Sequence, residues 1–175
     1  MVSLKGDTMT PSVTTPLRPP LYSTYGWTER LGILDLLTPF FLSCPDSSDF
    51  VRFEGLGATE AEALLEIMPA DALLDQQNNG PYLCELLRLA VERPGVTLSG
   101  YRIAPPRWDE RISVDGVSIP QAPDLPEAIP SDPLVLYKWP KLRALLALNS
   151  AIGEPDELLA LPLEGGGYGW WIWWD

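Results

Sequence analysis

The sequence predicts an α+β fold in which three to four helices pack on a small, mainly antiparallel sheet. A helix is indicated by four apolar residues at helical spacing, namely Leu83, Leu86, Leu87 and Ala90. Strands are indicated by apolar alternation across residues 111–119 and by β-prone segments near residues 50, 97 and 171. With 175 residues, 46% of them hydrophobic, the chain is long enough to bury one core. We therefore expect residues 27–175 to form a single domain.

Ahead of this domain, residues 1–26 predict a Pro-rich N-terminal arm. Four prolines lie there among Ser and Thr, a composition typical of extended chain: Pro11, Pro16, Pro19 and Pro20. The first helix is expected from Thr28, with leucines at every third position. It should end before Pro39, because a proline disfavours helical geometry in the residue that precedes it.

The next segment predicts a strand followed by a helix. Residues 50–53 have strand character, and the capping-box pattern Thr59-Glu60-Ala61-Glu62 predicts the start of a helix that continues to Ile67. A further turn or two is expected over residues 70–76. A cleaner helix then follows Pro81, which suits a first turn, and carries the apolar stripe described above.

Glycines between the first strand and its helix partly match a dinucleotide-binding fingerprint. Gly55 and Gly57 are in place, but the third glycine is missing, and Glu60 and Glu62 put negative charge where a pyrophosphate would bind. The glycines within 165–169 lack the Lys and Ser or Thr of a phosphate-binding loop. We therefore predict no cofactor.

The second half of the chain predicts more strands. Residues 96–103 should form one, with Gly100 as a bulge. In residues 111–119 the alternating residues flank Asp115-Gly116, a dipeptide that predicts a hairpin with a type I′ turn. Residues 120–133 contain many prolines and no periodic pattern, so a long Pro-rich surface loop is expected.

The last third predicts a helix and a C-terminal strand. The helix should begin at Trp139 and bury four leucines: Leu142, Leu145, Leu146 and Leu148. Three cations crowd its start, namely Lys138, Lys141 and Arg143. The helix macrodipole disfavours them there, so we expect a compensating anion from the acidic segments of the chain. Residues 154–163 predict a short turn or helix, and residues 170–174 a strand.

The formal net charge of −12 is concentrated in two segments. Residues 46–75 hold eight acids and one base, residues 144–175 hold five acids and no base, and the remainder is balanced. Such segments form either solvated faces or an acidic surface that meets a basic partner. The charge argues against direct binding to nucleic-acid phosphates and against an anionic membrane surface.

The absence of histidine excludes catalytic and metal-binding classes that require an imidazole. Cys44 and Cys84 have no partners for a thiolate zinc site, and we interpret them as buried free thiols. The chain has neither an apolar run long enough to span a membrane nor a signal-peptide core. A cytoplasmic protein without membrane association is therefore expected.

Carboxylates are the remaining route to catalysis. Two groups of acids could hold Mg²⁺ or Ca²⁺ or act as an acid–base pair: Asp109, Glu110 and Asp115 beside the predicted hairpin, and Asp46 and Asp49 in a loop. Neither spacing is diagnostic. The simpler interpretation is that Asp109 and Glu110 are exposed loop acids that pair with neighbouring arginines, and that Asp115 is a turn residue.

The C-terminal tryptophans are the most unusual feature, because four of the seven lie in the last six residues. In a strand, Trp170, Ile172 and Trp174 would face one side, and Trp171 and Trp173 the other. Such a strand is either buried on both faces or presents indoles to a partner. A mixed outcome, with one face in the core and one face at a partner, fits both patterns.

The sequence therefore favours a non-catalytic interaction protein, such as an inhibitor, immunity or assembly factor, that docks on a protein with a basic surface. The predicted partner-binding residues are Trp170, Trp171, Trp173, Trp174, Asp175, Glu60, Glu62 and Glu66. Two alternatives stay open. One is a nucleic-acid mimic that occupies the basic groove of a DNA-binding protein, and the other is a carboxylate- or metal-dependent enzyme. The sequence does not determine an oligomeric state.

Overall fold

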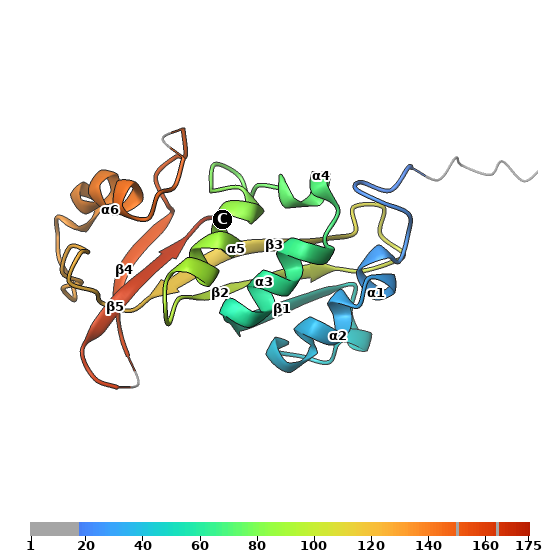
Figure 1. The fold of residues 1–175 in the computed structure, drawn as a ribbon, viewed down its shortest axis with the longest axis horizontal. Coiled ribbons are helices and arrows are strands. Elements are labelled where there is room, and N and C mark those ends of the chain that lie inside the picture. Colours follow the sequence, from blue (N-terminus) through green and yellow to red (C-terminus); the bar gives the residue numbers. More distant parts are fainter. Residues whose placement is uncertain (1–17, 150, 164) are drawn as a thin grey trace, which may run out of the picture.

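A five-stranded antiparallel sheet forms the backbone of the fold (Figure 1). The structure is a computed structural model that describes residues 18–149, 151–163 and 165–175. The strands are β1 (Phe50–Leu56), β2 (Thr97–Ile103), β3 (Arg111–Ile119), β4 (Glu157–Pro162) and β5 (Tyr168–Trp173). Their spatial order is β1-β2-β3-β5-β4, so the C-terminal strand β5 lies inside the sheet, between β3 and β4.

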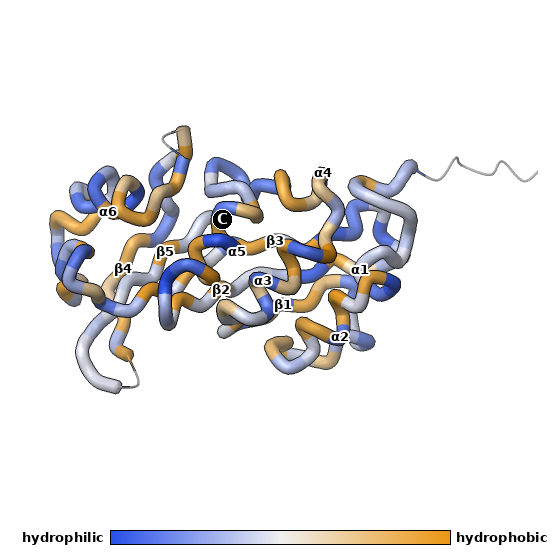
Figure 2. The backbone as a smooth tube through the Cα atoms, in the orientation of Figure 1, coloured by the Kyte–Doolittle hydropathy of each residue, from blue (hydrophilic) through white to orange (hydrophobic). Residues whose placement is uncertain are grey.

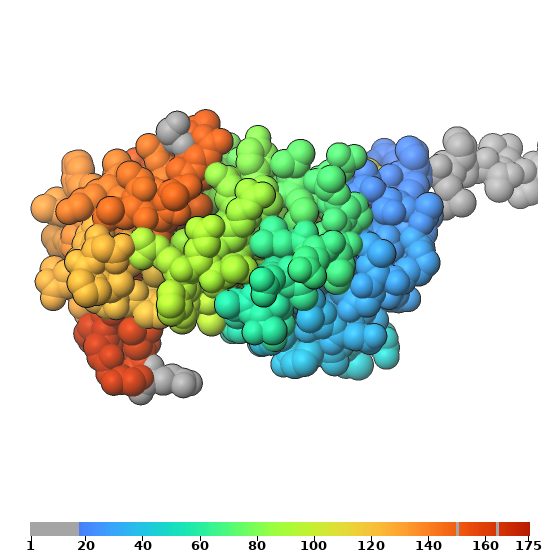
Figure 3. All heavy atoms as spheres, in the orientation of Figure 1, coloured from blue at the N-terminus to red at the C-terminus, as the bar shows by residue number. Residues whose placement is uncertain are grey.

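Helices pack against one face of this sheet. The α-helices are α1 (Trp27–Arg30), α2 (Ile33–Leu37), α3 (Ala58–Ile67), α4 (Ala70–Leu73), α5 (Leu83–Glu92) and α6 (Trp139–Leu145), and the 3₁₀ turns are η1 (Thr38–Phe40), η2 (Pro45–Ser47) and η3 (Val135–Lys138). In the space-filling view, residues of α3 to α5 cover the middle of the sheet, and the β4–β5 hairpin projects beyond them (Figure 3). The molecule is thus a helical layer on a sheet.

The core lies between the two layers. The predicted leucine stripe of α5 is buried, and it joins one cluster with inward-facing strand residues such as Phe53, Val117 and Ile172. Figure 2 shows apolar residues at intervals along both the strands and the helices. Alternate residues of a strand face opposite sides, so one side of every strand is committed to this core.

The predicted α+β class and antiparallel sheet are confirmed, but the helices differ from the prediction. The described residues contain six α-helices where three to four were predicted, and several of the six are very short. The helix expected from Thr28 is broken at Gly32, whose φ of 76° is left-handed. Helix α3 begins at Ala58 after Gly57, with no capping bond from a side chain, so the predicted capping box does not form.

The predicted hairpin at Asp115-Gly116 is wrong, because β3 runs through both residues without a turn. Pairing to β2 shifts between Ser99 and Gly100, where a bulge was predicted, and Asp115 is the extra residue on β3. Gly116 pairs with β2 on one side and with β5 on the other. Long-range pairing on both edges therefore outweighs the local turn preference.

The predicted turn or helix at 154–163 is also wrong, since residues 157–162 form strand β4. This strand pairs with β5 along its whole length and turns Leu158 into the core. The sequence Leu-Leu-Ala-Leu has no polar alternation, so its strand character depends on the neighbour β5.

Two Pro-rich segments were predicted at the surface. Of the arm, residues 1–17 lie outside the described residues. The loop 120–133 contains no helix or strand, yet it packs Leu125 and Ala128 into the core. The Gln121 side chain stabilises it by accepting a hydrogen bond from the Ala128 N–H at 2.8 Å. In the part of the chain that the structure describes, no helix has the length and hydropathy needed to cross a bilayer.

Candidate functional site

The side of the sheet opposite the helical layer carries the candidate site. We call this side the open face and define it by Arg52, Glu54, Ser99, Gly116, Ser118, Glu157, Leu159, Leu161, Trp171 and Trp173. These residues share one side because each is paired across strands with another of the set, or alternates with a core residue on its own strand. Within this set Glu54, Glu157, Leu159 and Leu161 are exposed, and Arg52, Trp171 and Trp173 are partly exposed.

The four C-terminal tryptophans divide between the two sides as the alternation predicts. Trp170 and Trp174 are buried on the core side. The Trp170 indole donates a hydrogen bond to the Pro126 carbonyl at 2.9 Å, and Trp174 packs edge-on against Trp139 with ring centroids 5.8 Å apart. In this fold Trp170 and Trp174 are unavailable to a partner. The candidate docking residues on this strand are therefore Trp171 and Trp173, which are partly exposed.

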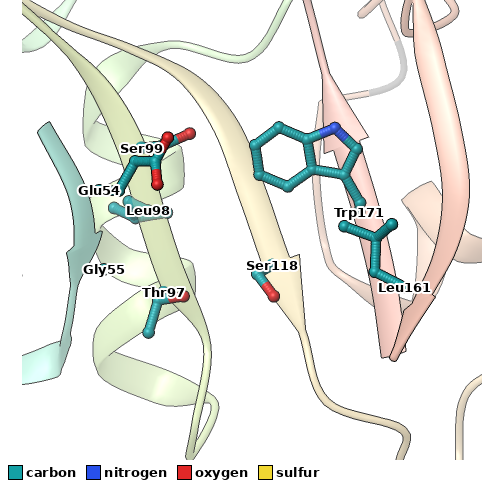
Figure 4. Close-up of a pocket in the computed structure, with 8 residues that line it drawn as sticks. All are labelled: Glu54, Gly55, Thr97, Leu98, Ser99, Ser118, Leu161 and Trp171. Atoms are coloured by element: carbon teal, nitrogen blue, oxygen red, sulfur yellow. The ribbon is translucent and has the colours of Figure 1, made fainter. Parts of the chain in front are cut away.

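The Trp171 indole reaches from β5 toward β3, with its ring visible face-on in Figure 4. Gly116 makes this possible, because a Cβ there would meet the Trp171 Cη2 atom at 2.5 Å. The indole Nε1 donates to Glu157 Oε2 at 3.1 Å, a hydrogen bond on the exposed side that favours this orientation of the ring. One face of the indole thus rests on the sheet, and the other is turned outward.

A shallow cavity of about 320 Å³ lies beside this indole. It is lined by Glu54, Gly55, Thr97, Leu98, Ser99, Ser118, Leu161 and Trp171 (Figure 4). The Ser99 side chain is 4% exposed, and its Oγ has no hydrogen-bond partner within the described chain. A buried hydroxyl without a partner costs about 1–3 kcal/mol, so this wall of the cavity holds an unused polar group.

The open face is acidic at its rim. Arg52 and Asp115 form a bidentate pair, with N–O distances of 2.9 and 3.1 Å, so the charge of this arginine is neutralised. Glu54 and Glu157 are exposed, and each comes from one of the two acidic segments. Neither has an ion-pair partner among the described residues. Exposed Leu159 and Leu161 add an apolar strip on β4, the same strand as Glu157.

The other predicted partner-binding residues lie elsewhere. Glu60, Glu62 and Glu66 are on α3, in the helical layer, with Glu62 and Glu66 exposed. Asp175 is exposed just beyond the end of β5, and its backbone N–H donates to Asp156. The acids of α3 and the exposed indoles of β5 are therefore on opposite layers of the molecule and do not form one surface.

The carboxylates considered for catalysis are held by structural contacts. Asp109 and Glu110, predicted to be exposed, are buried. The Asp109 carboxylate accepts from Arg107 at 2.9 and 2.7 Å and from Arg111 at 3.2 Å, as the predicted pairing required. The hydrogen bond from Arg107 lowers the pKa of Asp109 below its usual value.

Glu110 organises the start of the first helix. Its carboxylate accepts from the Gly26 N–H at 2.6 Å, the Thr28 N–H at 2.9 Å and the Thr28 hydroxyl at 2.7 Å. Together with the Arg52 pair at Asp115, these contacts place the three candidate acids in three separate networks. Across residues 18–149, 151–163 and 165–175, no cluster of three or more acids and thiols is placed to hold a metal ion.

Three smaller predictions are also resolved. Cys44 is exposed and Cys84 partly exposed, so the prediction of burial is wrong, while both are free thiols as predicted. The anion expected near the start of α6 is Asp132, whose carboxylate lies 2.6 Å from Lys138 Nζ. Asp132 belongs to the Pro-rich loop and not to either acidic segment.

Sequence reasoning missed Glu54, Ser99 and Leu161 as site residues. Their signal was weak, because they come from three strands and meet only through sheet pairing. No known family model, curated protein or solved structure matches this chain. Support for a site on the open face, with its indole and acidic rim, therefore comes from the fold of this chain alone.

Proposed function

We propose that this protein is a cytoplasmic, non-catalytic interaction module that docks a basic protein partner on the open face of its sheet. The observation that carries the proposal is the combination of an outward-facing Trp171 indole with exposed carboxylates on both sides of it. Indoles are favoured at the centre of protein interfaces because they bury a large area with few rotatable bonds. An inhibitor, immunity or assembly factor acts through such a surface.

Charge complementarity supports a partner with a basic surface. Glu54 lies on β1 and Glu157 on β4, at the two edges of the sheet, and Asp115 neutralises the Arg52 side chain. A basic segment of the partner would be attracted by the negative chain and would place its charges at these two carboxylates. The free thiols of Cys44 and Cys84 fit a reducing compartment, which supports the cytoplasmic part of the proposal.

The test compares matched double variants in affinity capture from the native host. Glu54→Gln with Glu157→Gln removes two charges from the open face, and Glu62→Gln with Glu66→Gln removes two from the helical layer. We expect the first variant to capture at least tenfold less partner than the wild type, while the second captures the same amount. Capture that weakens as the salt concentration rises is also expected.

Equal retention by both double variants would refute docking on the open face. Loss by the α3 variant alone would move the docking surface to the helical layer. If the captured species is a second copy of this chain, seen as a dimer in sedimentation, the heterologous partner is refuted.

No specific observation in the described structure favours either of the other two functions predicted from the sequence. A nucleic-acid mimic requires the acidic segments to align phosphate-like charges on one surface, whereas the α3 acids lie on the layer away from Glu157. An enzyme based on Asp109, Glu110 or Asp115 requires a reactive carboxylate, whereas all three accept hydrogen bonds from neighbouring residues.

A further inference from the structure

We infer that the cavity beside Trp171 is a receptor for the guanidinium group of a partner's arginine. This inference rests on the proposed function and names the group that the open face recognises. The cavity combines an aromatic platform, an exposed carboxylate and several hydroxyls, and no cationic side chain is among the residues that line it.

The indole supplies the platform. Its inner face rests over Gly116, so its outer face is free to stack a planar cation. The bond from Nε1 to Glu157 Oε2 already uses the only donor of the indole and places a negative charge next to the ring. A cation over the ring is therefore favoured by both the π-system and the adjacent carboxylate.

The far wall supplies acceptors. Glu54 is exposed and lies at the β1 side of the cavity, opposite Trp171 (Figure 4). Thr97 on β2 and Ser118 on β3 also line the cavity, and each carries a hydroxyl. A guanidinium carries five N–H donors in one plane, so one group can pair with the carboxylate and donate to hydroxyls while its face stacks on the indole.

Ser99 provides independent evidence that the cavity is a built site. Its side chain is 96% buried, its Oγ has no partner in the described chain, and it adjoins the edge of the Trp171 ring at Gly116. A small shift of the indole would open this oxygen to a donor. The donor-rich guanidinium would satisfy it, while an acceptor-rich anion would be repelled by Glu54.

Arginine fits this cavity better than lysine does. A lysine ammonium is a compact point charge that pairs with one carboxylate. A guanidinium can stack on an aromatic ring and donate two parallel hydrogen bonds to a carboxylate at the same time. A neutral planar group of the same shape would stack without pairing. Comparison of arginine, lysine and citrulline therefore separates the contributions of shape and charge.

The test uses the full chain and the capped peptides Ac-Gly-Arg-Gly-NH₂, its lysine form and its citrulline form, followed by two-dimensional NMR. We expect saturable shifts of the Trp171 indole N–H and the Ser99 and Ser118 amides with the arginine peptide. Binding should be at least tenfold weaker for citrulline and several-fold weaker for lysine. Glu54→Gln should weaken the arginine peptide at least threefold, and Glu62→Gln should not change it.

Shifts that are absent, that lie elsewhere, or that are equal for arginine and citrulline would overturn the inference. Trp171→Leu should abolish binding. If this variant does not fold, Glu54→Gln decides alone, because it changes an exposed side chain. If the arginine peptide does not bind but the partner docks on the open face, the guanidinium site alone is refuted. If the peptide binds but the Glu54 and Glu157 double variant still captures the partner fully, the proposed function alone is refuted.

Discussion

Substituting Gly116 by alanine should displace the Trp171 platform and destabilise the sheet. Gly116 lies on β3 under the indole, and its φ is not left-handed, so an added methyl is opposed by contacts and not by backbone strain. The new Cβ would lie 2.5 Å from Trp171 Cη2 and would also overlap Ser99 Oγ. Since ordinary contact begins near 3.4 Å, the ring must retreat by about 1 Å.

The magnitude follows from two opposing effects. Overpacking of this kind costs about 1–3 kcal/mol. Loss of glycine entropy in the unfolded chain returns about 0.4–1 kcal/mol. We therefore expect Gly116→Ala to lower the free energy of unfolding by about 1–2 kcal/mol, measured by urea denaturation with circular dichroism, and to shift indole fluorescence.

Gly165→Ala is the matched control, because a Cβ at Gly165 meets nothing within 4 Å. It should leave the free energy of unfolding within about 0.5 kcal/mol of the wild type. If Gly116→Ala behaves like Gly165→Ala in both stability and fluorescence, the placement of the Trp171 ring on the sheet is refuted.

Three other predictions concern stability. Gly100→Ala would push a Cβ into the backbone of β3, so it should cost about 3 kcal/mol or more and lower the midpoint of urea unfolding; a variant as stable as wild type would contradict the bulge geometry. Trp174→Ala should cost about 3–5 kcal/mol because Trp174 is buried, and Trp173→Ala clearly less; equal losses in urea unfolding would refute the division of the indoles. The lowered pKa of Asp109 means that its pair with Arg107 stabilises the fold above an unfolded pKa of about 4 and that this contribution is lost as the pH falls further. Arg107→Gln should therefore lose less stability than wild type between about pH 5 and pH 3, and an identical pH profile would count against the pair.

Local patterns in the sequence predicted much of the fold. The stripe of α5 and the strands β1, β2 and β5 follow from periodicity, because each has a core side that the pattern itself defines. Asp115-Gly116 misled the prediction because its turn preference is local, while its neighbours β2 and β5 are distant in the chain. Strand β4 was missed for the same reason.

The candidate site was only partly predictable. Alternation along residues 170–174 separates Trp171 from Trp170, and the sequence showed both indoles and acids. It did not show that the α3 acids lie on the other layer, or that Glu54 and Ser99 meet Trp171, because those relations arise from sheet order. Contacts between strands distant in sequence are set by tertiary packing, which local propensity does not encode.

Site-specific photo-crosslinking tests the central claim most directly. A photoreactive residue in place of Leu159, on the open face beside Trp171, is compared with one in place of Leu74, an exposed residue after α4. In cells of the native host, docking on the open face predicts an adduct of one defined higher mass from position 159 and none from position 74. An adduct from position 74 alone, or none from either position under conditions where the partner is captured, would contradict the account.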